Sequence, residues 1–399
     1  MIVGAAGAYL RAADGRQILD AISSWWVITH GHGHPHIVAA IQQQAQALDQ
    51  IIFAEYTHEP AERLARKLVA LAPAGLAHVF FSDSGSTSVE VAIKMALGFW
   101  RHSGEPRARI IVMEHSYHGD TIGAMSLGAR GAFNDIYEPL LFEVARIPFP
   151  AAGREEETLA GFEAACRQQG VAALLVEPLV LGAGGMLMYA PAVLAALRRL
   201  CTAHGVLLIA DEVMTGWGRT GTLFACEQAA VQPDIACYSK GLTGGALPLA
   251  VTLCQSAIYA AHYSEDRRRT FFHSSSFTAN PIACAAALAN LEIWEREPVL
   301  QRVRDLAALQ RAQLERFRGD SRFRNVRQTG TIAALDLEAV DPGYFATIGP
   351  RLRASFRAAN VLLRPLGNTL YVMPPYCVNA EELELVYGAI AAAAEACGV

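Results

Sequence analysis

The chemistry of this chain centres on one amine, that of Lys240, and one carboxylate, that of Asp211. Lys240 begins the glycine-rich stretch 240–245, where a flexible amine can reach into a site. Asp211 follows the apolar run 206–210, and burying a carboxylate there is costly unless it is paired. A lysine that forms a Schiff base and an acid that keeps a pyridine nitrogen protonated are what pyridoxal 5'-phosphate chemistry needs. The pair therefore predicts a site for that cofactor, with a structural salt bridge at Asp211 as the alternative.

A phosphate could be bound by the segment 82–87, which carries Gly85 and Ser86 between an expected strand and an expected helix. Glycine permits close approach of the backbone, and a helix N-terminus presents unpaired N–H groups at the positive end of its dipole. Serine and aspartate also cap ordinary helices, so a plain cap remains the alternative.

A flat heterocycle could be enclosed by Tyr117 and Val213. Tyr117 follows the apolar run 109–113, so we expect its ring near the carboxyl edge of a sheet, where it can stack. Val213 comes two residues after Asp211 on the same face of the chain, and we expect it to pack opposite Tyr117. A tyrosine buried in the core is the alternative.

Four further residues are candidates for substrate binding. Because adjacent side chains cannot both face one core, either Trp25 or Trp26 can line a pocket, with core and interface packing as the alternative. Arg364 is flanked by apolar residues and suits a carboxylate from the protein or from a substrate. Arg219, on the glycine-rich loop 216–221, is a looser candidate.

The histidines at 30, 32, 34 and 36 invite a metal interpretation. A spacing of two fits neither a helix-borne pair nor a zinc finger, and no cysteine or carboxylate stands nearby in sequence. We therefore expect a polar turn and no metal.

Bulk composition narrows the class of protein. A chain of 399 residues exceeds an ordinary single core, and 52% hydrophobic with 18% charged residues suits a compact enzyme. A net charge of −5 without a dense basic stripe gives no reason to expect nucleic acid. The lack of a long apolar run or a recognisable signal peptide, and eight scattered cysteines, favour a cytoplasmic enzyme that binds no membrane.

Short apolar runs alternate with helical patterns from about residue 78, which indicates an α/β fold with a mostly parallel sheet. We expect strands at 78–81, 109–113, 172–176, 206–210, 235–238 and 249–253, and helices at 87–100 and 191–204. A smaller α+β part should follow, with helices at 280–297, around 303–317 and at 380–396, and strands at 331–337 and 369–372. The expected division is an N-terminal segment 1–50 that joins the smaller part, a large cofactor-binding domain 51–289 and a small domain 290–399.

Together these segments resemble the class III, fold-type I pyridoxal-phosphate aminotransferases. The resemblance runs from about residue 9 to 385, and Ala-Asp-Glu-Val around Asp211 with Ser-Lys-Gly-Leu-Thr-Gly-Gly around Lys240 marks the superfamily. Ser-Ser-Trp-Trp, Leu-Arg-Pro-Leu-Gly and Tyr-Val-Met-Pro-Pro-Tyr are narrower, and are similar to members that convert 8-amino-7-oxononanoate to 7,8-diaminononanoate in biotin synthesis. For these members the resemblance implies S-adenosylmethionine as amino donor, although some relatives use lysine.

The resemblance also implies roles in holding the cofactor. Lys240 would carry the cofactor, and Asp211 would face its ring nitrogen with Val213 and Tyr117 against the ring. Gly85 and Ser86 would bind its phosphate.

Further implied roles concern the substrates and the partner subunit. Tyr117 would help to shape the substrate site beside the tryptophan pair, Arg364 would hold the acceptor's carboxylate, and Arg219 would assist the donor. In this family the segment 273–277 crosses from the partner, which implies a homodimer in which Ser275 and Ser276 complete the phosphate site and Ser274 lines the substrate site.

This chain departs from the family pattern in three places. The usual His-Gly-Pro-Thr-Phe is His-Ser-Ser-Ser-Phe, so Ser276 keeps a hydroxyl for the phosphate while Ser274 and Ser275 change the pocket wall. Leu366 replaces an aromatic residue, and a family tyrosine near the N-terminus has no counterpart. The alternatives are a broad ω-amino acid:pyruvate aminotransferase and, disfavoured by Lys240 and Asp211, a non-catalytic cofactor- or metal-binding protein.

Overall fold

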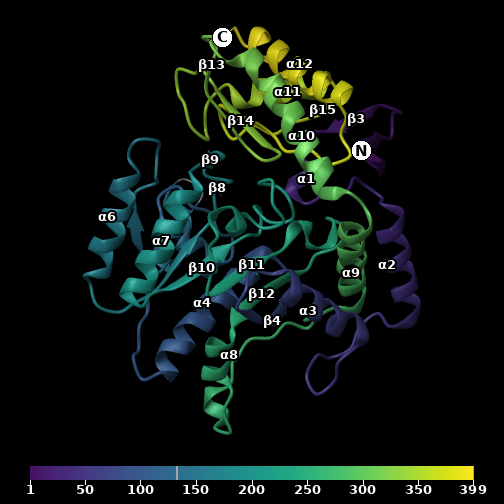
Figure 1. Ribbon diagram of the computed structural model, residues 1–399. Helices are drawn as coiled ribbons and strands as arrows, with labels where there is room; N and C mark the ends of the chain where they lie inside the picture. Colours follow the sequence, from purple (N-terminus) through teal and green to yellow (C-terminus); the bar gives the residue numbers. More distant parts are fainter. Residues whose placement is uncertain (132–133, 399) are drawn as a thin grey trace.

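A seven-stranded sheet forms the centre of the larger part of the molecule in the computed structural model, which describes residues 1–131 and 134–398 (Figure 1). Its order is β4-β12-β11-β10-β7-β5-β6, and all neighbours run parallel except that β12 is antiparallel to both β4 and β11. The strands are β4 (Leu76–Ser82), β5 (Arg109–Met113), β6 (Ala145–Ile147), β7 (Val171–Val176), β10 (Leu207–Asp211), β11 (Ile235–Tyr238) and β12 (Ala250–Gln255). The predicted α/β class is confirmed, and the six expected strands are present with ends within two residues of those expected.

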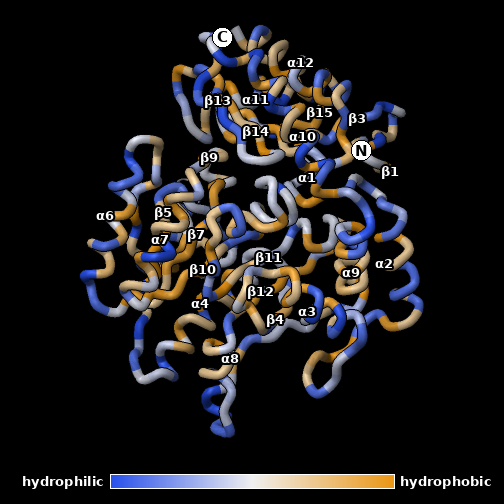
Figure 2. Tube along the Cα trace, in the orientation of Figure 1, coloured by the Kyte–Doolittle hydropathy of each residue, from blue (hydrophilic) through white to orange (hydrophobic). Residues whose placement is uncertain are grey.

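Helices cover both faces of this sheet because its strands are apolar on both sides. In β7, for example, Leu174 and Leu175 are both buried but belong to two separate hydrophobic clusters, as the alternation of side chains along a strand requires. Figure 2 shows the resulting band of hydrophobic residues along β7 and β10. The surrounding elements are α3 (Glu59–Leu71), α4 (Gly85–His102), α5 (Ile122–Leu127), α6 (Glu155–Cys166), α7 (Pro191–His204), α8 (Ser256–His262) and the short pair β8 (Val180–Leu181) and β9 (Leu187–Met188).

The smaller part combines both ends of the chain. Strand β3 (Gln17–Asp20) pairs in parallel with β15 (Val361–Leu362), so the purple N-terminal strands lie beside the yellow C-terminal helix in Figure 1. The other elements here are β1 (Ile2–Ala6), β2 (Tyr9–Ala12), β13 (Phe323–Thr329), β14 (Ile332–Leu337), β16 (Thr369–Val372), α10 (Val299–Leu314), α11 (Gly349–Ala358) and α12 (Ala380–Ala396). Strands β1, β2, β3 and β13 were not expected from the sequence.

Three helical elements connect the two parts: α1 (Ser23–Trp26), α2 (Pro35–Ala47) and α9 (Pro281–Arg296). Helix α9 packs against α2 and α3. The boundary expected at residue 290 lies within α9, and the division into domains stays a prediction.

Two global features concern cysteines and membranes. All eight cysteines are free thiols, and six of them are buried. Among the described residues no helix is both long and apolar enough to cross a bilayer.

Candidate active site

Lys240 and Asp211 lie at the carboxyl ends of two adjacent parallel strands. Asp211 is the last residue of β10 and is opposite Cys237 of β11, and Lys240 begins the short 3₁₀ turn Lys240–Thr243 just after β11. The backbone of Lys240 is left-handed, with φ of 47°, which is uncommon for a residue other than glycine. The sheet therefore delivers an amine and a carboxylate to the same edge, as the sequence predicts.

Burial lowers the pKa of the Lys240 amine to about 8, and Arg219 adds to this shift. The carboxylates of Asp211 and Glu177 oppose it, which places both of them within electrostatic range of the amine. A lowered pKa leaves a substantial fraction of the amine neutral near neutral pH, and the neutral form is the one that attacks a carbonyl carbon.

Asp211 is a buried carboxylate that is already hydrogen-bonded. His118 Nδ1 lies 2.7 Å from its Oδ2, and the backbone N–H of Val213 donates to its Oδ1 at 3.1 Å. His118 Nε2 is buried without a hydrogen-bond partner among the described residues. These bonds offset the desolvation of a carboxylate that still has lone pairs for a further donor.

The N-terminus of α4 is both capped and closely packed. Ser84 and Thr87 form a capping box in which the Ser84 hydroxyl accepts the N–H of Thr87, so the cap uses that N–H and leaves those of Gly85 and Ser86 for the predicted anion site. Glycine is required beside it, because a Cβ on Gly85 would lie 2.6 Å from Val213 and one on Gly119 would lie 2.1 Å from Ser86 Oγ. The turn expected to bind the phosphate is therefore in contact with Val213, the residue expected to pack on the cofactor ring.

Glu177 is a site residue that the sequence interpretation missed. Its carboxylate accepts the N–H of Tyr117 at 3.0 Å and the N–H of Gly182 at 2.9 Å, and so fixes the loop that presents the half-exposed Tyr117 ring. Burial raises its pKa to about 7, with Asp211 adding and His118 opposing. A signal was available, since Glu177 follows the apolar run 171–176 as Asp211 follows 206–210.

The residues Ser23–Trp26, here called the tryptophan turn, bring the two indoles to Lys240 and Arg364. Trp26 is buried, donates from Nε1 to the Tyr371 hydroxyl at 2.9 Å, and has Lys240 Nζ 4.6 Å from its ring centre. Trp25 is 50% exposed and has the Arg364 guanidinium 4.6 Å from its ring centre. Arg364 is exposed and makes no ion pair with a carboxylate in the part of the chain that is described. An indole face and an unpaired guanidinium are thus side by side.

The tryptophan turn has an unfavourable backbone. Ser23, Ser24 and Trp26 all have positive φ, of 53°, 60° and 67°. Each left-handed residue other than glycine costs about 1–2 kcal/mol. The turn therefore persists only because surrounding groups hold it.

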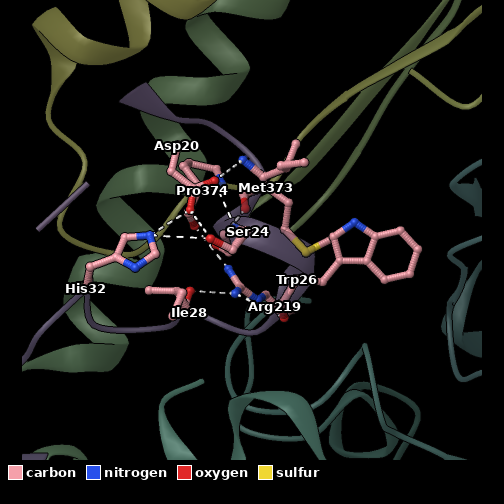
Figure 3. A network of polar contacts seen from close by, with 10 residues as sticks. Asp20, Ser24, Trp26, Ile28, His32, Arg219, Met373 and Pro374 are labelled. Carbon is pink, nitrogen blue, oxygen red and sulfur yellow. Dashed lines mark hydrogen bonds and ion pairs between the residues drawn. The ribbon is translucent and has the colours of Figure 1, made fainter. Parts of the chain in front are cut away.

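Arg219, from the glycine-rich loop 216–221, is one of those groups. It is 1% exposed and donates to the carbonyls of Pro374 at 3.0 Å and Ile28 at 2.8 Å, with a longer bond to Trp26 O at 3.4 Å (Figure 3). These bonds enclose the guanidinium, so it braces the backbone around the tryptophan turn. A direct contact with the amino donor stays a prediction.

The serines of segment 273–277 lie beside the start of α4 rather than against Lys240. Ser275 donates to Asp83 of the same chain, and the Ser276 carbonyl accepts from Gln50 at 2.6 Å. Ser274 is exposed. Their predicted roles toward the phosphate and the substrate are untested by this geometry and stay predictions.

The four alternating histidines each contact a different polar residue. The pairs are His30–Asn290 (2.8 Å), His32–Asp20 (2.8 Å), His34–Glu297 (3.6 Å) and His36–Glu292 (2.7 Å). No set of three or more histidine, cysteine, aspartate or glutamate side chains is arranged to hold a metal within residues 1–131 and 134–398. The segment 30–36 thus attaches the N-terminal chain to its surroundings.

The residues at the sheet edge fit pyridoxal phosphate. Asp211 offers a carboxylate to a ring nitrogen, Lys240 offers an amine to an aldehyde, and the first turn of α4 offers N–H groups to a phosphate. The orphaned His118 Nε2 is consistent with a ligand in this space, and Gly85 and Gly119 allow Val213 and Ser86 to lie close to the turn that would hold the phosphate.

Comparison with known proteins agrees with a pyridoxal-phosphate site. The family model "Aminotransferase class-III" matches residues 1–394. The chain is 49% identical to the adenosylmethionine-8-amino-7-oxononanoate aminotransferase of Synechococcus elongatus, over 98% of this chain and 93% of that protein. It is 41% identical to the protein of the same name from Mycobacterium leprae, over 97% and 89%.

Two solved structures are equally similar in fold. The enzyme of that name from Methanocaldococcus jannaschii has a TM-score of 0.94 at 32% identity, covering 99% of this chain and 93% of its own. An amine transaminase from an uncultivated Pseudomonas species, solved with pyridoxal phosphate bound, also has a TM-score of 0.94 at 32% identity, covering 100% and 95%. The backbone alone does not distinguish between them.

Proposed function

The chain belongs to the class-III aminotransferases, which use pyridoxal phosphate, and from that premise we propose that it aminates 8-amino-7-oxononanoate to 7,8-diaminononanoate, with S-adenosylmethionine as amino donor. The relatives from Synechococcus and Mycobacterium, whose names state this activity, support the proposal. The reaction belongs to biotin synthesis.

The observation that carries the substrate proposal is the pairing of Trp25 with Arg364 near Lys240. An oxononanoate is a long apolar chain that ends in a carboxylate, and the exposed indole face and the unpaired guanidinium suit those two parts. Because Lys240 Nζ lies over Trp26, the neighbour of Trp25, an acceptor held by Arg364 can reach the amine along the tryptophan pair.

The chain's own residues would divide the chemistry as follows. Bound pyridoxal phosphate supplies an electron sink for negative charge on the substrate carbon. Lys240 holds the cofactor and, when released, moves a proton at the reacting carbon. Asp211, oriented by His118, keeps a proton on the ring nitrogen. Gly85 and Ser86 bind the phosphate, together with Ser275 and Ser276 of a partner subunit.

Val213 and Tyr117 would enclose the two faces of the cofactor ring, and Tyr117 would also border the substrate. The donor first leaves its amino group on the enzyme, and the acceptor takes it in a second half-reaction at the same site. Ser274 is the residue of segment 273–277 proposed to face the substrate.

We propose that the enzyme is a homodimer with the site at the interface. Segments 49–56 and 272–280 lie side by side, since Gln50 donates to Ser276 O and Asn280 donates to Asp49 O. Ile52, Tyr56, Phe272 and Phe277 are all exposed by more than half on these segments. Exposed apolar side chains on neighbouring segments suit burial against a second copy.

A broad amine transaminase is the second candidate, because such an enzyme is as similar in fold as the biotin enzyme. The two differ in the acceptor. Purified enzyme should transfer an amino group from S-adenosylmethionine to 8-amino-7-oxononanoate, and the gene should rescue a biotin auxotroph that lacks this step. Turnover of pyruvate with simple amines and no turnover of the oxononanoate would overturn the proposal. Half-reactions with S-adenosylmethionine and with lysine, measured separately, identify the donor.

A further inference from the structure

The carboxylate of Asp20 lies at the start of the tryptophan turn and is completely buried. Its Oδ1 accepts the backbone N–H groups of Ile22 at 3.2 Å and Ser24 at 2.9 Å, and its Oδ2 accepts the Ser24 hydroxyl at 2.9 Å. Ser24 has φ of 60° and ψ of −65°, a strained γ-turn conformation. In this conformation the backbone N–H and the hydroxyl of Ser24 both donate to Asp20. The carboxylate therefore stabilises the strained form of the turn.

His32 completes the environment of that carboxylate. Its Nε2 lies 2.8 Å from Asp20 Oδ2, where it donates, and 3.5 Å from the Ser24 hydroxyl. A carboxylate without solvent depends on such donors, because an unpaired buried charge is strongly unfavourable. Figure 3 shows His32 reaching the turn from the side opposite Trp26.

The turn is thus held at both ends by polar side chains. Asp20 and His32 hold its beginning, and Arg219 holds the carbonyls that follow it (Figure 3). What the turn presents between them is Trp25, which faces Arg364, and Trp26, which faces Lys240.

Resting on the proposed function, we infer that Asp20 and His32 are positioning residues that determine recognition of the long, carboxylate-terminated keto acid. They fix Trp25 beside Arg364 and touch neither the substrate nor the cofactor. The backbone positions of Lys240 and Asp211 are set by the ends of β11 and β10 and not by this turn, although the Lys240 amine lies over Trp26. Weakening the Asp20–His32 pair therefore impairs the acceptor half-reaction and spares the donor half-reaction.

The first test is Asp20→Asn in the holoenzyme. Asparagine keeps the shape but turns an N–H₂ group toward donors, so the turn loses part of its support. We expect KM for 8-amino-7-oxononanoate to rise about tenfold, with the donor half-reaction rate within about twofold of wild type. The circular-dichroism signal of the stacked Trp25–Trp26 pair, recorded without substrate, should weaken. Asp14→Asn, an exposed carboxylate bonded to Arg16, is the matched control and should change none of these.

A second pair of variants at His32 keeps the test decisive if Asp20→Asn does not fold. His32→Leu should reproduce the rise in KM, and His32→Gln, which can still donate to Asp20, should restore it. The inference is wrong if the donor and acceptor steps fall together, or if KM and the dichroism signal stay at wild-type values. If the wild-type enzyme does not turn over 8-amino-7-oxononanoate, the proposed function is wrong instead. The comparison of circular-dichroism signals then still tests whether Asp20 and His32 position the tryptophan pair.

Discussion

The site has two parts that are held in place in different ways: the lysine side, formed by Lys240 and Asp211, and the tryptophan side, formed by the tryptophan turn. Lys240 and Asp211 occupy the ends of neighbouring parallel strands in a rigid sheet, and their placement follows from a register that pairs Asp211 with Cys237. Trp25 and Trp26 occupy a turn with three left-handed residues, held by Asp20, Arg219 and carbonyls near residue 374. From this difference we propose that the chemistry common to the class depends on the sheet, and that recognition of the acceptor depends on the tryptophan turn.

The largest effect is expected on the lysine side. Lys240→Ala removes both the amine that holds the cofactor and the group that moves the proton, so turnover should fall by about 10⁴-fold or more. Mass spectrometry of the borohydride-reduced wild type should place the cofactor on Lys240. Lys67→Ala, a change at a half-buried lysine of α3 that pairs with Glu295, should leave both measurements unaltered. Wild-type turnover in Lys240→Ala would refute the assignment.

Asp211→Asn should be the next most damaging change. The amide leaves the ring nitrogen without a charged acceptor and His118 without its carboxylate partner, so both half-reactions should slow by roughly 10³-fold. Stopped-flow measurements with donor and with acceptor check this, and Asp305→Asn on the exposed face of α10 is the control. A loss confined to the acceptor step would contradict the division between the two sides.

The free energy of unfolding should depend on pH through Glu177, which lies on the lysine side. Its folded pKa of about 7 lies above the ordinary 4.5, so its contribution to stability is fully present below pH 4.5 and is lost as pH rises through 7. The loss can reach on the order of 3 kcal/mol, from 1.36 kcal/mol per pKa unit. Glu177→Gln should flatten this part of the urea-denaturation profile between pH 5 and 8. Glu163→Gln, at an exposed position of α6, should keep the wild-type slope.

His30, which follows the tryptophan turn, should respond to pH in the opposite direction. Burial lowers its pKa from 6.5 to about 4, so its contribution is present above pH 6.5 and is lost as pH falls through 4. We expect His30→Gln, which can still donate to Asn290, to lose less stability than wild type on acidification, by up to about 3 kcal/mol. His204→Gln, on an exposed histidine, should behave as wild type in the same denaturation series. An unchanged profile in His30→Gln would show that this histidine does not titrate in that range.

The smallest effect is expected at Arg364. Arg364→Ala removes a charged partner for the acceptor's carboxylate, so KM for 8-amino-7-oxononanoate should rise by roughly 10- to 100-fold while the donor half-reaction keeps its rate. Steady-state kinetics with each substrate varied in turn measure the split. Arg353→Ala, an exposed arginine of α11, is the matched control. Equal losses with both substrates would mean that Arg364 does not select the acceptor.

The same contrast explains how far the sequence alone could lead. The sheet was predictable because its strands are continuous apolar runs and its chemical residues follow them directly, as at Asp211 and Lys240. The pairing of Trp25 with Arg364 could be anticipated only through family resemblance, since 339 positions (364 − 25) separate them. The burial of Arg219 could not be predicted, because its three acceptors are backbone carbonyls, which leave no mark in side-chain patterns.

The hydrogen bonds of Arg219 to distant backbone carbonyls also bear on the order in which parts of the fold form. The turn at residues 23–26 is completed by Arg219 and by the carbonyls of Met373 and Pro374, which the ribosome adds much later than the turn itself. Because contacts between residues far apart in sequence form only after the intervening chain is available, we expect the tryptophan turn to be completed after the sheet that carries Lys240. We therefore expect a newly made chain to form its central sheet before it completes the tryptophan turn.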